Sequence, residues 1–183
     1  MINRQLKSWL VGISLFIAIF ALAGAAAGCG SSDSSSSPEE LGLVTVEVEA
    51  PDFTLPTMAG PEITLSALQG KPVVLNCWAL SCPPCRQELP YFDAAANQYA
   101  GKVTIVAVNL GDSVSKLEEF FGGNKVGFVV VLDKDDQVAS KYSTGYIPNT
   151  FFIDSQGIVR YLKPGAFINE EELNASIDKL LNY

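Results

Sequence analysis

Residues 73–90 read VVLNCWALSCPPCRQELP, and this stretch decides how the chain is interpreted. The unbroken apolar run from Val73 to Ala79 is typical of a strand that is buried on both faces. Pro84 favours the first turn of a helix, and the segment 84–99 repeats apolar residues at helical spacing. The cysteines of Cys82-Pro83-Pro84-Cys85 therefore lie where a buried strand passes into a helix.

This position favours a redox-active cysteine pair. Cysteines three positions apart at a helix N-terminus can close a small disulfide ring, and the helix dipole and free amides stabilise a thiolate on the first. We expect Cys82 to be the exposed nucleophile, and Cys85 to be more buried and to resolve the mixed disulfide. Because Pro83 and Pro84 have no N–H, the Cys85 amide is the donor left for the Cys82 sulfur. Fewer donors stabilise the thiolate less, which favours a reductant.

The composition excludes several other chemistries. The chain has 183 residues, with 12 basic and 20 acidic residues and no histidine. The missing histidine excludes Ser/His/Asp catalysis and histidine-ligated haem, and it leaves most zinc sites without ligands. Haem attachment would need histidine where Arg86 stands. We expect no metal and no cofactor, and the acidic balance argues against a nucleic-acid partner.

The first 28 residues have the layout of a secretory signal, with basic residues, an apolar run over 9–27 and small residues before Cys29. Ala26-Ala27-Gly28-Cys29 resembles a bacterial lipobox, in which the cysteine is lipidated. We therefore expect an extracytoplasmic protein that is anchored to a bacterial membrane as a lipoprotein, through Cys29. The alternatives are a soluble secreted or periplasmic form, cleaved after an Ala-x-Ala sequence, and an uncleaved N-terminal anchor.

The remaining chain predicts a tether and one domain. Residues 30–38 are almost all serine and glycine, which is typical of a flexible tether. We assign residues 1–28 to the signal, 29–43 to the tether and 44–183 to the domain.

Within the domain, strand-like and helix-like patterns alternate. Strands are expected at 44–48, near 63–65, and at 73–79, 103–110 and 128–132, with the first of them half-buried. A hairpin is expected from 151–153 and 158–161. Helices are expected at 84–99, 113–121 and 136–142, followed by a last helix that Asn169 and Glu172 begin with a capping box. This order predicts an α/β fold, with a central mixed sheet covered by helices on both faces.

Four stretches of the sequence resemble one family. Residues 73–90 resemble the active-site signature of membrane-anchored thioredoxin-like proteins of the TlpA/ResA type. APDFTL at 50–55 and LQGKP at 68–72 resemble the lead-in of these proteins and of the wider redoxin group. GYIPNTFFID at 145–154 resembles their cis-proline segment. The resemblance implies a thioredoxin-like fold with an N-terminal β extension.

The resemblance also implies a site and an activity. It gives Pro148 a cis peptide bond that brings the Ile147 backbone beside Cys82, where an extended substrate could pair with it. Family members commonly reduce the disulfides of exported thiol proteins, among which apocytochrome c is a candidate through cytochrome c maturation. They receive electrons from a membrane thiol donor.

The chain departs from the family pattern at three positions. Ser81 replaces a tryptophan, which makes the rim of the site smaller and more polar. Cys77 replaces an aromatic residue and is expected to be an inert core thiol. Asn76 replaces the buried aspartate that shuttles a proton in cytosolic thioredoxins, and an amide cannot titrate. Glu88, one helical turn after Cys85, is a candidate for proton transfer or partner contact, although a solvated helix carboxylate is the interpretation that its position in the sequence favours.

Other functions remain open from the sequence. A thiol peroxidase of the redoxin group would need a hydroxyl residue and a proline where Ala79 and Leu75 stand. A non-enzymatic lipoprotein could bind a partner or copper through the two thiolates, and a structural disulfide would use the same cysteines. The acidic cluster Asp133, Asp135 and Asp136 is interpreted as a solvated turn, because it lacks the spaced ligands of a calcium loop.

Overall fold

The computed structural model describes residues 36–142 and 145–183. The predicted signal at 1–28 and the predicted lipidation site Cys29 lie outside the described residues, so both stay predictions. Among the helices that the structure does describe, none is long and apolar enough to cross a membrane.

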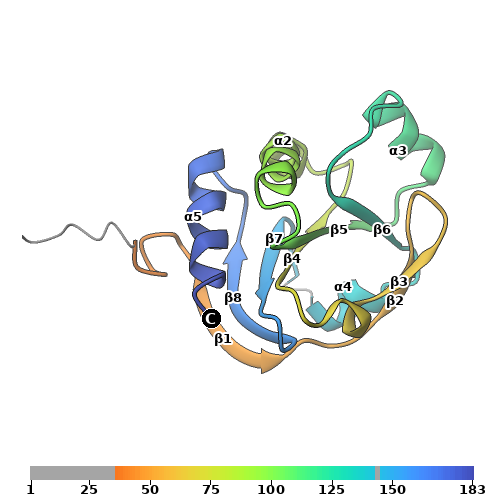
Figure 1. Ribbon diagram of the computed structural model, residues 1–183. Coiled ribbons are helices and arrows are strands. Elements are labelled where there is room, and N and C mark those ends of the chain that lie inside the picture. The colour runs from red at the N-terminus through yellow and green to blue at the C-terminus, as the bar shows by residue number, and fades with distance from the viewer. Residues whose placement is uncertain (1–35, 143–144) are drawn as a thin grey trace, which may run out of the picture. The chain divides into compact units, whose positions relative to one another are not determined.

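Six strands form the central sheet in the order β1-β8-β7-β4-β5-β6 (Figure 1). Parallel pairs join β4 (Val73–Trp78) to β5 (Thr104–Leu110) and β5 to β6 (Val129–Asp133). Antiparallel pairs join β4 to β7 (Asn149–Ile153), β7 to β8 (Ile158–Pro164), and β8 to β1 (Val44–Glu49). The predicted mixed sheet is confirmed, and β4 lies in its interior.

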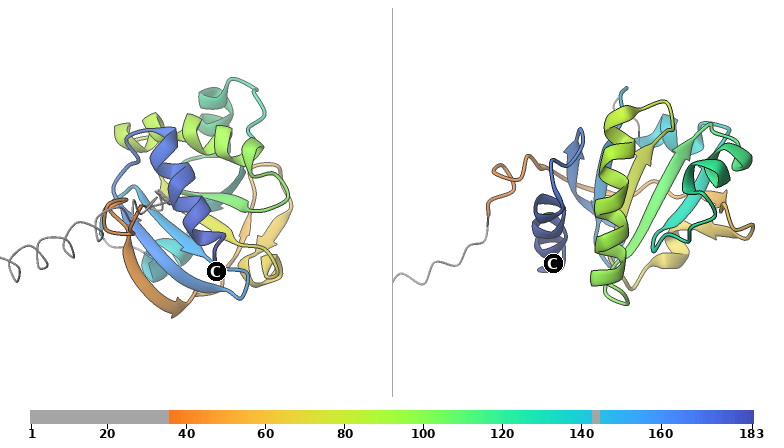
Figure 2. Two further views of the ribbon diagram at one scale, coloured as in Figure 1. Left: turned by 60° about the vertical axis from the view of Figure 1, so that its left-hand side comes forward. Right: turned by 90° about the horizontal axis from the view of Figure 1, so that it is seen from above.

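Helices cover both faces of this sheet. On one face lie α2 (Pro83–Gln98), α3 (Val114–Phe121) and α5 (Glu170–Leu180), and on the other lies α4 (Gln137–Tyr142) (Figures 1 and 2). The second face also carries a small hairpin of β2 (Thr54–Pro56) and β3 (Glu62–Thr64), which leads into the 3₁₀ turn η1 (Leu65–Leu68).

The alternation of side chains along β4 separates two buried layers. Val74 and Trp78 lie in the layer that packs against α2, α3 and α5. Val73, Leu75 and Cys77 lie in the opposite layer, against the hairpin and α4. Cys77 is thus the buried core thiol that the sequence predicted.

The N-terminal strand differs from its prediction. β1 forms the edge of the sheet, and Val44 and Val48 are 50% and 52% exposed, so the expected half-buried alternation is wrong. The register shifts between Thr45 and Val48, where Glu47 has a positive φ of 58°. The apolar residues that do bury here are Leu41 and Leu43, in the segment assigned to the tether. Packing on the domain therefore begins before residue 44.

The last helix begins as predicted. Asn169 caps α5, because its Oδ1 accepts a hydrogen bond from the Glu172 N–H at 2.8 Å. The return bond of the capping box shifts by one residue, since Glu172 Oε2 accepts from the N–H of Ile168 at 2.8 Å. The cap fixes the position of the residues just before α5, among them Ile168.

Candidate active site

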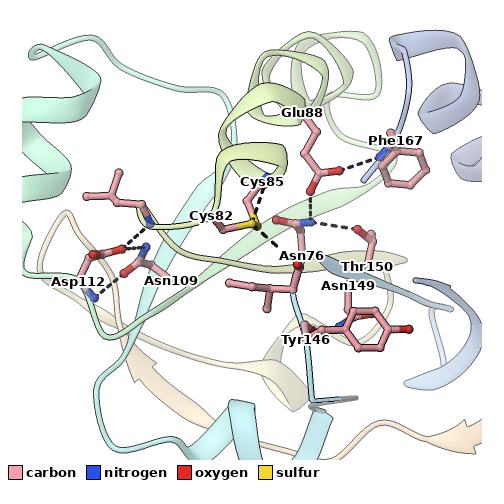
Figure 3. Close-up of a disulfide and its surroundings, with 12 residues drawn as sticks. Asn76, Cys82, Cys85, Glu88, Asn109, Asp112, Tyr146, Asn149, Thr150 and Phe167 are labelled. Carbon is pink, nitrogen blue, oxygen red and sulfur yellow. Dashed lines mark hydrogen bonds between the residues drawn. A yellow bond between two sulfur atoms is a disulfide. The ribbon is translucent and has the colours of Figure 1, made fainter. Parts of the chain in front are cut away.

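Cys82 and Cys85 form a disulfide at the junction of β4 and α2 (Figure 3). Cys82 is the N-cap residue of α2, and Pro83 and Pro84 occupy the first two positions of the helix. The Cys85 N–H donates to Cys82 Sγ at 3.3 Å, which is the donor that the two prolines predicted. We call Cys82 and Cys85 the cysteine pair.

Cys82 is less exposed than predicted. It remains the more accessible of the two, with 8% exposure against 0% for Cys85. Its sulfur is turned toward Cys85 in the disulfide, and the Ile147 carbonyl oxygen lies 3.8 Å from Cys82 Sγ. The solvent-facing rim of the junction is formed by Ser81, Pro83 and Pro84, which are all exposed.

The segment before β7 faces the cysteine pair. The Ile147–Pro148 peptide bond is cis, as the resemblance implied. Ile147 is partly buried and Pro148 is buried, whereas the neighbouring Tyr146 is 54% exposed. The Ile147 backbone therefore lies beside Cys82, with an aromatic side chain open to solvent next to it.

Glu88 is fully buried, so the favoured interpretation of a solvated helix carboxylate is wrong. Its Oε1 accepts from Asn76 Nδ2 at 3.0 Å, and its Oε2 accepts from the Phe167 N–H at 2.9 Å (Figure 3). Burial raises the pKa of Glu88 to about 7, against the lowering effect of these two hydrogen bonds and of the Lys163 charge. A carboxyl group with a pKa near neutrality can both accept and release a proton under ordinary conditions.

Asn76 joins three elements behind the cysteine pair. Its Nδ2 donates to Glu88 on α2 and, at 3.0 Å, to Thr150 Oγ1 on β7. The sequence singled out Asn76 and Glu88, but it did not show that they touch each other or that Thr150 joins them. The structure brings these predicted residues together in one buried network.

Sequence reasoning missed the residues that hold the loop before Cys82. Asp112 Oδ2 accepts from the Leu80 N–H at 2.7 Å and from Asn109 Nδ2 at 2.9 Å, and Asn109 Oδ1 accepts from the Asp112 N–H at 3.0 Å. A signal was present, because the carboxyl ends of the adjacent parallel strands β4 and β5 meet at one edge of the sheet. Polar residues after β5 are therefore placed beside the loop that follows β4.

An ion pair near Glu88 was also missed. Lys163 Nζ lies 2.7 Å from Glu172 Oε1, and both side chains are largely buried. The positive charge of Lys163 lowers the pKa of Glu88, and the negative charge of Glu172 raises it. This pair belongs to β8 and α5, far from Glu88 in the sequence, so no local pattern indicates it.

Two further predictions concern groups outside this network. Burial and the charge of Asp133 raise the pKa of Cys77 to about 12, consistent with an inert thiol. The prediction of a solvated acidic turn is wrong for Asp133, which is buried and accepts hydrogen bonds from the N–H groups of residues 137–139. Within residues 36–142 and 145–183, no group of histidine, cysteine or acidic side chains could hold a metal ion.

The AhpC/TSA family model matches residues 46–162. The chain belongs to the AhpC/TSA family. It is 40% identical over 132 residues to the thiol-disulfide oxidoreductase ResA of Geobacillus kaustophilus, which covers 70% of this chain and 74% of that protein. It is 31% identical to the thioredoxin-like protein YneN of Bacillus subtilis, over 91% of this chain and 95% of that one.

A solved structure agrees with these relatives. The crystal structure of a putative thiol:disulfide interchange protein DsbE from Chlorobium tepidum matches with a TM-score of 0.67 and 32% identity, covering 74% of this chain and 96% of that one. The predicted thioredoxin-like fold and the resemblance to TlpA/ResA-type proteins are confirmed. Within the AhpC/TSA family, this protein is a thiol-disulfide oxidoreductase.

The raised pKa of Glu88 predicts a pH-dependent stability. Folding moves this pKa from about 4.5 to about 7, so the folded state holds an extra proton between these values and loses stability as the pH rises through them. The loss is on the order of 3 kcal/mol. Urea denaturation of the oxidised wild type and of Glu88→Gln, at pH 4.5 and pH 8, measures it.

Glu88→Gln has no titrating group at this site, so its stability relative to the wild type should rise between the two pH values. If the amide loses a hydrogen bond, the free energy of unfolding changes by the same amount at both pH values. The difference between the two pH values is then unaffected. Glu62→Gln, at an exposed position on β3, is the matched control and should follow the wild type. If the stability of the wild type and of Glu88→Gln changed equally with pH, the raised pKa of Glu88 would be contradicted.

Proposed function

We propose that the protein is an extracytoplasmic reductant of disulfides in exported proteins, with Cys82 and Cys85 as its redox-active pair. The observation that carries this proposal is the pair's position at the N-terminus of α2, with the Ile147 backbone against Cys82. The direction of electron flow is supported by the hydrogen bonds at Cys82. Because Pro83 and Pro84 have no N–H, the thiolate of Cys82 receives little stabilisation from the loop, which keeps the reduced form reactive toward disulfides.

The reaction takes two exchanges. The Cys82 thiolate attacks one sulfur of the substrate disulfide, which breaks the substrate S–S bond, forms a mixed disulfide and releases the first substrate thiolate. Cys85 then loses its proton and attacks Cys82 Sγ. The second substrate thiolate leaves, and the Cys82–Cys85 disulfide closes. Two electrons pass to the substrate, and a membrane thiol donor restores the dithiol.

Glu88 is the group that receives the Cys85 proton in this scheme. It follows Cys85 by one helical turn, it is buried, and its pKa of about 7 suits proton transfer near neutrality. The buried Asn76 amide lies in contact with Glu88 and cannot take the proton itself.

Substrate docking falls to the cis-proline segment. An extended substrate chain that pairs with the Ile147 backbone would bring its disulfide to Cys82 Sγ. The exposed Tyr146 adds an apolar surface beside it. The substrates we propose are exported thiol and disulfide proteins, with apocytochrome c as a candidate.

The N-terminal segment supports a membrane location. The sequence at 26–29 resembles a lipobox, in which the cysteine carries the lipid. We therefore place the domain outside the cytoplasm, held at a membrane by lipid on Cys29.

Cys85→Ala should trap the mixed disulfide. With no resolving thiol, Cys82 stays bound to the substrate, whereas Cys82→Ala has no nucleophile and forms no adduct. Non-reducing electrophoresis after incubation of each reduced variant with insulin measures the adduct. Cys77→Ala, which lacks the buried thiol of the opposite layer, is the control and should retain full reductase turnover. An adduct that forms equally through Cys85 would reverse the assigned roles.

The reduction potential of the cysteine pair tests the direction of electron flow. Equilibration with glutathione or dithiothreitol should give a value below that of protein disulfide isomerase, about −180 mV. A value near that of the oxidant DsbA, about −120 mV, would show that the protein introduces disulfides instead.

Cys29→Ser should release the protein from the membrane. Expression of the full chain in a bacterium that lipidates exported proteins, followed by membrane fractionation and mass measurement of the mature N-terminus, checks this. The wild type should carry the lipid mass on Cys29. A wild-type N-terminus that is cleaved before another residue, or an uncleaved chain, would contradict the proposal.

A further inference from the structure

One buried oxygen at the active site has no partner. Asn76 is fully buried, and its Oδ1 makes no hydrogen bond. Both hydrogens of Nδ2 are used, by Glu88 Oε1 and by Thr150 Oγ1, and these two acceptors fix the orientation of the amide. A buried acceptor without a partner destabilises the state in which it stays unpaired, because it has lost its hydrogen bonds to water. Oδ1 would therefore gain stability from a hydrogen-bond donor that is present in another redox state of the protein.

The unpartnered oxygen faces the cysteine pair. Asn76 stands between Val74 and Trp78 on the face of β4 that packs against α2, and Cys82 and Cys85 lie in this same buried layer. In Figure 3 the Oδ1 of Asn76 points toward the disulfide, and Nδ2 points away from it toward Glu88. The disulfide has no S–H group, so it offers Oδ1 no donor.

Reduction supplies that donor. A dithiol such as dithiothreitol breaks the Cys82–Cys85 bond by giving two electrons and two protons, and it leaves as its own disulfide. Each cysteine sulfur gains one proton, and Cys82 is the more accessible of the two thiols. Cys85 is fully buried, which favours the neutral thiol over the thiolate. Its new S–H lies in the same buried layer as the Asn76 side chain.

We propose that Asn76 Oδ1 accepts the S–H of Cys85 in the reduced protein, which makes Asn76 a positioning residue that stabilises the dithiol. This inference rests on the proposed redox function of the pair. Because the bond exists only after reduction, it favours the dithiol over the disulfide and raises the reduction potential. The scarcity of amide donors at Cys82 has the opposite effect and lowers the reduction potential. The potential of the cysteine pair therefore depends on both contributions.

The same amide links the thiol to the acid. Oδ1 accepts from Cys85 while Nδ2 donates to Glu88, and each bond polarises the amide in the sense that strengthens the other. The amide thus performs the acceptor half of the task that a titrating acid would perform at this position, and Glu88 remains the group that takes up the proton when Cys85 ionises.

Asn76→Leu tests the proposal, because it keeps the approximate shape of the side chain and removes the acceptor. The equilibrium constant for reduction by dithiothreitol should fall about tenfold, equivalent to about 30 mV. Thr150→Val is the matched control, since it removes one partner of Nδ2 and leaves Oδ1 in place. Its equilibrium constant should stay close to that of the wild type. Equal shifts in the two variants, or a rise in Asn76→Leu, would overturn the proposal.

A second measurement does not depend on whether Asn76→Leu folds. The S–H stretching band of Cys85 in the reduced wild type can be assigned by infrared spectroscopy, as the band that Cys85→Ala lacks. A hydrogen-bonded thiol absorbs at lower wavenumber than a free one. We expect a lowered band, and a band at the free-thiol position would overturn the proposal.

The two proposals can fail separately. If wild-type Cys82 and Cys85 do not exchange with dithiothreitol at all, the proposed function fails. If they exchange normally while the Cys85 band and the Asn76→Leu equilibrium are unperturbed, the present inference alone fails.

Discussion

The burial of β4 on every side is the constraint on which the site depends. All six of its residues are buried, and β5 and β7 occupy its two edges. The chain can reach solvent only where the strand ends, and there α2 begins within a few residues. The cysteine pair lies at this junction, where the Cys85 amide of the first helical turn donates to Cys82 Sγ and the strand fixes the direction of approach.

The same strand separates two cysteines that are close in sequence. Cys77 faces the hairpin layer and lies among aliphatic and aromatic residues, where burial holds its thiol in the neutral form. Cys82 leaves the strand and meets a helix N-terminus and the cis-proline segment. Reactivity therefore follows from the element that each thiol occupies, because composition alone treats the two residues alike.

Local patterns in the sequence were sufficient to predict most helices and strands. They did not predict the long-range contacts. Strand runs, the helix after Pro84 and the cap at Asn169 depend on neighbouring residues, and all were found. The cis bond at Pro148 came from the resemblance. Glu88 was misjudged, although its spacing from Cys85 and from Phe92 places it on the buried face of α2. Its partner Phe167 is 79 residues away, and no periodicity indicates such a contact.

The amide at position 76 determines how the buried acid can behave. Its Nδ2 lies 3.0 Å from Glu88 Oε1, so an aspartate there would set two carboxyl groups within hydrogen-bonding distance. Two such groups cannot both ionise in a buried layer, and one pKa is then driven strongly upward. Because Asn76 carries no charge and donates a hydrogen bond, it lowers the pKa of Glu88 against the effect of burial. Glu88 therefore titrates near neutrality as a single group, and the amide oxygen is left for the thiol.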